Sequence, residues 1–192
     1  MRPIPILMIL TLLATPALAH SGAGMQGGLM SGFTHPLFGW DHVVAMVAVG
    51  LWGAFLGQPA IWLLPVVFPL VMAFGGALGI IGVPLPAVEQ GIALSGVVLG
   101  LLVALAVRAP IWVAAVIVGV FAIFHGHAHG TELPDAANPF AFALGFVVAT
   151  GLLHLAGIGF GFFTALPWGK WLVRAAGVVI ALVGAAFLTG VA

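Results

Sequence analysis

Two short segments of the sequence concentrate histidines and carboxylates within an otherwise apolar chain. The first is HPLFGWDH, residues 35–42, which contains His35, Asp41 and His42 and runs directly into a long apolar stretch. Imidazole and carboxylate groups bind divalent metal ions, and ionisable groups inside an apolar stretch usually mark a site or a pathway. We therefore predict that these three side chains are metal ligands.

The spacing of these three residues does not fit one metal ion on one straight helix. On a helix that begins at Pro36, a residue favoured at the first helical position, His35 and His42 would share a face but lie about 10 Å apart along the axis. Asp41 would point about 100° away from His42 and would lie beyond the first turn. Either the helix start is irregular, or the residues form successive sites, or another helix completes the site.

The second segment is FHGHAHGTE, residues 124–132. His125 and His129 are four residues apart, which lets two imidazoles on one helix meet one ion, and Glu132 falls within about 20° of His125. His127 points to the opposite side and is the weakest candidate of the segment. Because the ligands include no thiolate and too many histidines for magnesium, the set suits nickel, cobalt or zinc.

Three further ionisable residues and one aromatic residue are secondary candidates. Glu89 is either a ligand or a carboxylate that stabilises the first turn of a helix. His154 lies deep in a later apolar stretch, where it could bond a backbone carbonyl or relay an ion. His20 could chelate through its α-amine and its ring if a leader is removed. Phe68 lies between two prolines that predict a kink or break, and it could pack there or gate a pathway.

The composition places all these residues in a membrane protein. The chain has 192 residues, of which 64% are hydrophobic and 4% charged, and its mean hydropathy is +1.34. Soluble domains carry about a quarter charged residues, so the lipid bilayer is the expected surrounding of most of the chain. A net charge of zero gives no support for a nucleic-acid partner. The absence of cysteine excludes disulfides and thiolate sites.

The N-terminus is typical of a cleavable signal peptide. Arg2 supplies the positive charge, a short apolar stretch follows, and the small residues Ala17 and Ala19 occupy the positions that a signal peptidase reads. We predict a leader over residues 1–19, with an uncleaved anchor as the alternative, and one membrane domain over residues 20–192. Cleavage implies a bacterial inner-membrane protein whose mature N-terminus is periplasmic.

The apolar blocks predict an all-α integral membrane protein with six transmembrane helices. We place these helices at about residues 36–57, 60–81, 88–107, 111–131, 138–162 and 170–190. With the N-terminus outside, alternation puts Arg108, Lys170 and Arg174 on the cytoplasmic side, as the positive-inside rule requires.

Glycines recur four residues apart in several apolar blocks. Such pairs let helices approach closely in lipid, where no hydrophobic effect drives association. The pairs are Gly53/Gly57, Gly75/Gly79, Gly96/Gly100, Gly126/Gly130 and Gly157/Gly161. We expect close helix contacts at these positions.

The two motifs, in this order and with a leader and six spans around them, resemble the HupE/UreJ family. This resemblance implies a bacterial membrane protein that is associated with hydrogenase or urease maturation and acts as a nickel or cobalt permease. Carried over by position, it points to the ligands already named, which are His35, Asp41, His42, His125, His129 and Glu132. It also draws attention to Phe68 and Glu89.

We therefore expect a permease that carries Ni²⁺, with Co²⁺ or Zn²⁺ as the other ions, from the periplasm to the cytoplasm. The ion is the cargo, and no permanently bound cofactor is expected. The chain contains no GxxxxGK[ST] motif, which gives no support for ATP-driven transport. A divalent ion gains about 4.6 kcal/mol per 100 mV when it moves inwards, so a facilitator could accumulate it. Homo-oligomerisation is left open.

Two other functions compete with transport. An intramembrane zinc-dependent hydrolase could hold zinc through His125, His129 and a third histidine, with Asp41 or Glu132 as general base. A haem-binding membrane cytochrome could use histidines as axial ligands, although such ligands normally lie within facing spans and without adjacent carboxylates.

Overall fold

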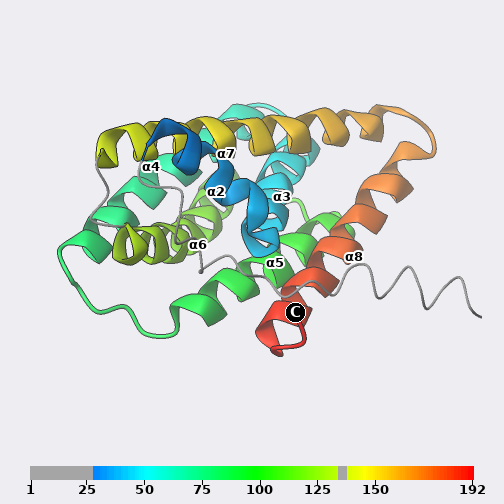
Figure 1. Cartoon of the computed structure of the whole chain (residues 1–192). Helices are drawn as coiled ribbons and strands as arrows, with labels where there is room; N and C mark the ends of the chain where they lie inside the picture. Colours follow the sequence, from blue (N-terminus) through cyan, green and yellow to red (C-terminus); the bar gives the residue numbers. More distant parts are fainter. Residues whose placement is uncertain (1–27, 134–137) are drawn as a thin grey trace, which may run out of the picture.

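The computed structural model describes residues 28–133 and 138–192, and within these ranges every regular element is a helix (Figure 1). The predicted leader and His20 lie outside the described residues. In chain order the helices are α2 (Leu29–Phe38), α3 (Trp40–Leu56), α4 (Ala60–Ile80), α5 (Val88–Ala104), α6 (Ile111–Glu132), α7 (Pro139–Gly161), the 3-10 helix η1 (Phe162–Ala165) and α8 (Gly169–Leu188).

Helix α3 is the centre of the bundle. It packs against α2, α4, α5, α7 and α8, and its residues from Ala45 to Gly53 are buried with the single exception of Val47. A helix that is apolar on all sides is expected in such an interior position. The indole Nε1 of Trp52 donates a 3.0 Å hydrogen bond to the carbonyl of Val107 and ties α3 to the segment before α6.

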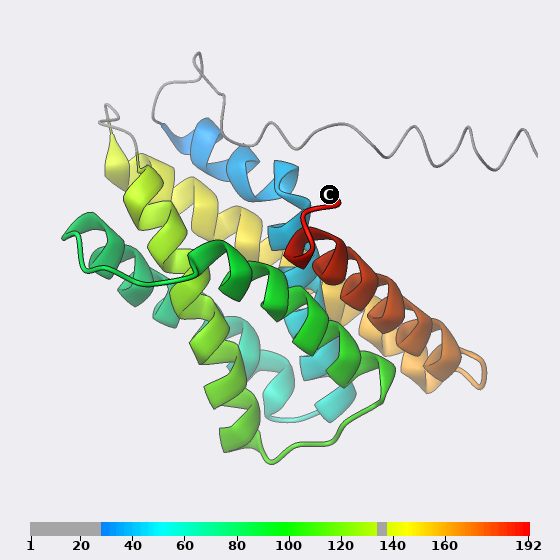
Figure 2. The same ribbon diagram turned by 90° about the horizontal axis from the view of Figure 1, so that it is seen from below.

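The remaining helices pack as close pairs, with α4 on α6, α5 on α8, and both α2 and α3 on α7. Figure 2 shows α8 in red beside α5 in green. Glycine permits these approaches, because a Cβ at Gly50 of α3 would overlap the backbone carbonyl of His154, and a Cβ at Gly157 of α7 would overlap that of Val47. The expected close contacts occur at the pairs 75/79, 96/100, 126/130 and 157/161. Gly57 differs, because it ends α3 with a φ of 80°.

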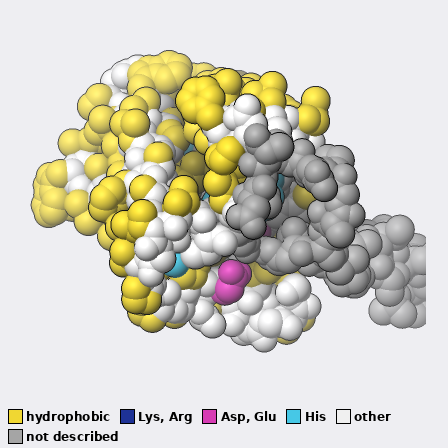
Figure 3. Space-filling model, turned by 60° about the vertical axis from the view of Figure 1, so that its left-hand side comes forward, with side chains coloured by type: hydrophobic (Ala, Val, Ile, Leu, Met, Phe, Trp, Pro, Cys, Tyr) yellow, Lys and Arg dark blue, Asp and Glu magenta, His cyan; other side chains and the backbone are white. Residues whose placement is uncertain are grey.

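Four helical segments are long and apolar enough to cross a membrane, namely α4, α6, α7 with η1, and α8. Helices α2 and α3 together would supply a fifth span, although a bend of 85° separates them, and α5 is shorter at 17 residues. Large apolar side chains are exposed along these helices, and Figure 3 shows them in yellow over much of one face. An all-helical membrane protein with four or five candidate spans is therefore confirmed, whereas a sixth span is not.

The predicted helix over residues 36–57 is wrong at its N-terminal end. The chain is already helical from Leu29, Pro36 lies inside α2, and the break comes at Gly39, where φ is −88° and ψ is 101°. Packing on α7 explains the extra helix, since Gly32 fits so closely against Phe142 that a Cβ there would overlap its carbonyl. The other predicted helices agree with the observed ones to within one turn.

The two prolines in α4 do not break it. The helix runs without interruption from Ala60 to Ile80, with Pro65 and Pro69 inside it. Because Pro69 has no N–H, the carbonyl of Pro65 loses its usual donor within the helix. That carbonyl interacts instead with His154 of α7, while Phe68 is fully buried between the two prolines.

Replacing Gly126 of α6 with alanine should lower the free energy of unfolding by about 1–3 kcal/mol. The new Cβ would overlap the carbonyl oxygen of Met72 in α4, which is backbone and cannot rotate away. Gly119→Ala on the same helix is the matched control, because its nearest neighbour would be the Val71 side chain at 3.8 Å. Denaturant titration of the purified protein in detergent measures both, and equal effects would contradict the proposed contact.

Candidate metal-binding site

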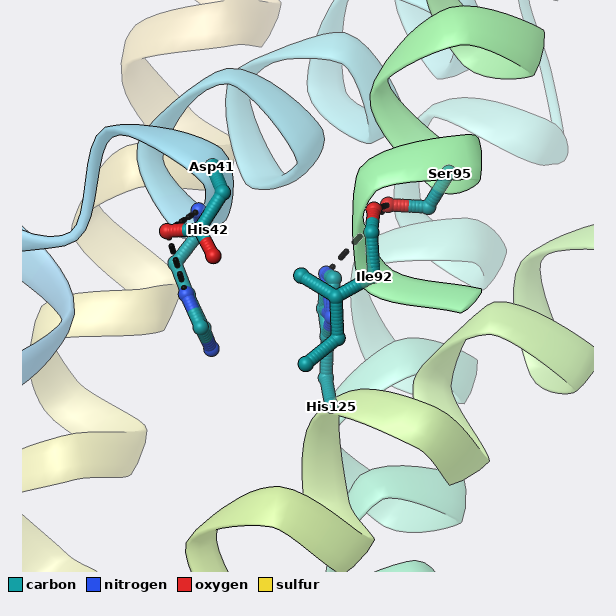
Figure 4. A network of polar contacts seen from close by, with 5 residues as sticks. All are labelled: Asp41, His42, Ile92, Ser95 and His125. Atoms are coloured by element: carbon teal, nitrogen blue, oxygen red, sulfur yellow. Dashed lines mark hydrogen bonds and ion pairs between the residues drawn. The ribbon is translucent and has the colours of Figure 1, made fainter. Parts of the chain in front are cut away.

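Asp41 and His42 form the start of α3 and hold each other in place. The break at Gly39 puts both in the first turn of this helix, whereas a helix starting at Pro36 predicts Asp41 beyond the first turn. Oδ1 of Asp41 accepts a 2.9 Å hydrogen bond from the backbone N–H of His42 and lies 2.8 Å from its Nδ1 (Figure 4). A carboxylate here also benefits from the positive end of the helix dipole.

This contact assigns the tautomer of His42. An ionised carboxylate only accepts hydrogen bonds, so Nδ1 of His42 carries the proton and Nε2 keeps its lone pair. Nε2 is buried and has no hydrogen-bond partner. A carboxylate that fixes a histidine in this way is the arrangement found behind many metal-ligating imidazoles. His42 thus offers one oriented nitrogen lone pair.

His125 of α6 is fully buried and offers a second lone pair. The hydroxyl of Ser95 in α5 donates a 2.6 Å hydrogen bond to the carbonyl of Ile92, and its oxygen lies 3.4 Å from Nε2 of His125 (Figure 4). Since the hydroxyl proton is already used, Nε2 of His125 is the donor in this pair. Nδ1 of His125 then keeps its lone pair, and it is buried without a hydrogen-bond partner.

Four imidazole rings from three helices follow one another in space, and we call them the histidine string. The ring centroids of His35 and His129 are 4.9 Å apart, those of His129 and His42 are 4.7 Å apart, and those of His42 and His125 are 4.9 Å apart. The 85° bend explains how residues 35 and 42 both reach His129. The sequence left open an irregular helix start or the participation of another helix. The structure has both, because the helix breaks at Gly39 and α6 contributes His125 and His129.

Aromatic side chains enclose the histidine string. On α7, the ring of Phe146 lies 4.3 Å from His129, and that of Phe142 lies 5.8 Å from His35. At the inner end, Phe68 of α4 lies 5.4 Å from His125 on one side and 5.4 Å from His154 on the other. Phe68 therefore separates the string from His154.

His154 has a second polar neighbour one helical turn away. The ring of His154 interacts with the carbonyl of Pro65 without reaching hydrogen-bond geometry, so neither ring nitrogen has a hydrogen-bond partner. Thr150 lies one turn earlier on α7, and its buried hydroxyl oxygen also lacks a partner. Both residues thus have buried polar atoms with unused hydrogen-bonding capacity.

Other predicted ligands lie elsewhere. Nε2 of His127 is 2.7 Å from the carbonyl of Val83 and anchors α6 to the α4–α5 connection. Glu89 is exposed in the first turn of α5. Glu132 is the last residue of α6, and its side chain is not among those described. Within the described part of the chain, no three histidine, aspartate or glutamate side chains converge as one metal cage.

Four residues near the histidines were not singled out in the sequence: Ser95 on α5, and Thr150, Phe142 and Phe146 on α7. Ser95 lies 30 positions before His125 on α5, so no local motif connects the two. Thr150 could have been found, because it is four residues before His154 and therefore shares its helix face. Phe142 and Phe146 follow the same spacing on α7 and look like ordinary core residues in the sequence.

Comparison with known proteins gives a match along nearly the whole chain. The family described as HupE / UreJ protein matches residues 8–187. Protein HupE of Rhizobium leguminosarum bv. viciae is 48% identical over 182 residues, which cover 94% of this chain and 95% of that protein. No solved structure gives a significant match.

The tautomer of His42 should depend on Asp41. In Asp41→Ala the Nδ1–H group loses its acceptor, so the ¹⁵N resonances of the ring should move away from those of a pure Nδ1–H tautomer. The measurement is NMR of ¹⁵N-histidine-labelled protein in micelles, with His42 assigned from a His42→Gln sample. Glu89→Ala removes an exposed carboxylate of α5 and should leave the spectrum unchanged. An unchanged His42 signal in Asp41→Ala would refute the assignment.

Proposed function

The chain belongs to the HupE / UreJ family, and on that premise we propose that it is a permease that carries a divalent transition-metal ion, Ni²⁺ in particular, from the periplasm to the cytoplasm. The observation that carries the proposal is the histidine string, in which each ring lies within 4.9 Å of the next. The ion would serve hydrogenase or urease maturation.

The string suits a moving ion better than a resident one. A buried polar atom without a partner costs about 1–3 kcal/mol, and a passing cation recovers that cost by binding the lone pair. His42 and His125 each present one such lone pair. Conduction needs sites that bind well enough to attract the ion and weakly enough to release it. Successive imidazoles meet this need. Among the described residues, no three carboxylate or imidazole side chains surround a single point where an ion would be held tightly.

Asp41 is the positioning residue of this proposed pathway. Its hydrogen bonds fix the ring of His42 and make the free nitrogen a better donor to a metal. Its negative charge also offsets part of the charge of the ion. The lysine and arginine residues of the described ranges lie at the other end of α3, so they do not oppose an ion at this end.

Phe68 is the proposed gate between the histidine string and an inner site at His154. Its ring touches His125 and His154 at the same centroid distance of 5.4 Å. An ion that passes from one histidine to the other has to displace this ring. Glu132 and Glu89 are then peripheral candidates that could attract ions to the outer surface.

We propose a six-span topology for this function. Helices α2 and α3 would form one broken span, and α5, with 17 residues, reaches the lower limit of about 17–25 residues for a span. Arg108, Lys170 and Arg174 gather at one end of the bundle, which supports a cytoplasmic location for that end. With a leader over residues 1–19, the mature N-terminus would be periplasmic in an inner membrane.

The zinc-dependent hydrolase alternative is not supported. Asp41, its candidate general base, accepts both of its hydrogen bonds from His42. The match to the HupE / UreJ family over residues 8–187 supports a transport role over a hydrolase. The membrane potential would drive uptake without catalysis, since inward movement of two charges is favourable by about 4.6 kcal/mol per 100 mV.

Proteoliposomes that contain the wild-type protein should accumulate ⁶³Ni²⁺ above the level of empty liposomes when the interior is negative. Asp41→Ala and His129→Ala should lower the initial rate at limiting Ni²⁺ by about tenfold or more, as expected for loss of an orienting carboxylate or of a ligand. Competition by Co²⁺ and Zn²⁺ in the same assay measures ion preference.

The matched control for this assay is His127→Gln. It changes another histidine of α6, one that contacts the carbonyl of Val83 rather than the string, and should retain transport. Wild-type uptake equal to that of empty liposomes, or variants equal to wild type, would rule out the proposed permease.

Phe68→Leu should raise the initial rate of ⁶³Ni²⁺ uptake, because a smaller side chain leaves an easier passage between His125 and His154. Phe121→Leu shortens another buried phenylalanine, which is only 8% exposed on α6, and controls for a general loosening of the bundle. The same proteoliposome assay compares the two. A gate role is excluded if Phe68→Leu slows uptake to the same extent as Phe121→Leu.

A further inference from the structure

A cavity of about 350 Å³ lies at the end of the bundle opposite Asp41. Ligand pockets typically have volumes of about 300–1,000 Å³. Its lining includes Phe55 at the end of α3, Thr164 of η1, and Trp171 of α8. It also includes Arg108, which follows α5, and Lys170 and Arg174 of α8. We call it the basic cavity.

The basic cavity collects nearly all the positive charge of the protein. The whole chain has four lysines and arginines and no net charge, and three of the four line this one cavity. Its lining contains no carboxylate. Among the described residues, the ion pair between Asp41 and His42 is the one observed, so Arg108, Lys170 and Arg174 have no acidic partner there. Like charges around one cavity repel each other unless an anion lies between them.

Two of the three cations are held in place for binding. Nε of Arg174 donates a 2.7 Å hydrogen bond to the carbonyl of Ala104, and its guanidinium lies 5.0 Å above the ring of Trp171. The guanidinium of Arg108 lies 5.1 Å above the ring of Phe55. A cation–π contact holds a guanidinium beside the ring and leaves its terminal N–H groups available. Such groups bind phosphate oxygens in pairs.

We propose that the basic cavity binds a phosphate group through Arg108, Lys170 and Arg174. The phosphate is either the headgroup of an acidic phospholipid or a free phosphate ion. The surroundings suit a lipid headgroup, because Trp168 and Trp171 are exposed beside the cavity and tryptophan is enriched at membrane–water interfaces. Basic pockets between transmembrane helices bind acidic headgroups in this way. The inference does not depend on metal transport.

Native mass spectrometry of the full chain from detergent micelles tests the proposal. The protein is titrated with phosphatidylglycerol and, separately, with phosphatidylcholine of the same acyl chains. Wild type should retain phosphatidylglycerol preferentially. Arg108→Gln combined with Lys170→Gln should bind it roughly thirtyfold more weakly, since each removed cation weakens binding by about 1 kcal/mol. Arg108→Lys combined with Lys170→Arg keeps both charges and should retain most of the binding.

Added inorganic phosphate distinguishes the two sources. Displacement of phosphatidylglycerol by phosphate at low millimolar concentration supports a free phosphate site, whereas resistance to displacement supports a lipid headgroup. Equal retention of the two lipids by wild type, together with no bound phosphate, overturns the proposal. Unchanged binding by the double glutamine variant also overturns it. If that variant does not fold, Lys170→Gln alone replaces it, because Lys170 is exposed.

Discussion

The pair of hydrogen bonds between Asp41 and His42 is the interaction on which the rest of the candidate site depends. It fixes one imidazole in one tautomer at the point where two helices meet at an angle of 85°. The ring of His42 is one of the two inner members of the histidine string, since it lies beside both His125 and His129. Without that orientation the rings of α2 and α6 would still be present, but no ordered nitrogen would connect them.

Hydrophobic blocks were sufficient to predict most helices, because a bilayer-length apolar stretch leaves the backbone few alternatives to a helix. The spacing of His125 and His129 was likewise sufficient to put both on one face of α6. Helix α2 and the break at Gly39 could not be predicted, since they depend on the close packing of Gly32 against Phe142, far away in the chain. Ser95 was missed because its neighbour His125 is also far away in the chain.

The histidine string and the basic cavity lie at opposite ends of α3. This helix has 17 residues, so its ends are about 25 Å apart. A carboxylate and the histidine string lie at one end, and the three cations of the basic cavity lie at the other. A cation leaving past these positive charges would be repelled by them, and an anion bound in the cavity would lower that barrier. Lipid composition and ion passage would then be linked through the cavity's charge.

The glycine contacts between α3 and α7 have a consequence for the rate of ion passage in the proposed permease. Gly50 and Gly157 let the two backbones touch at the carbonyls of His154 and Val47, so the helices cannot slide past each other without separating. Collective motions and register shifts of helices take microseconds to milliseconds. In the proposed permease, helices locked together at these glycines would leave the rotation of Phe68 as the movement that an ion waits for. Throughput would therefore be set by one ring in a rigid scaffold rather than by alternation between two shapes of the whole bundle.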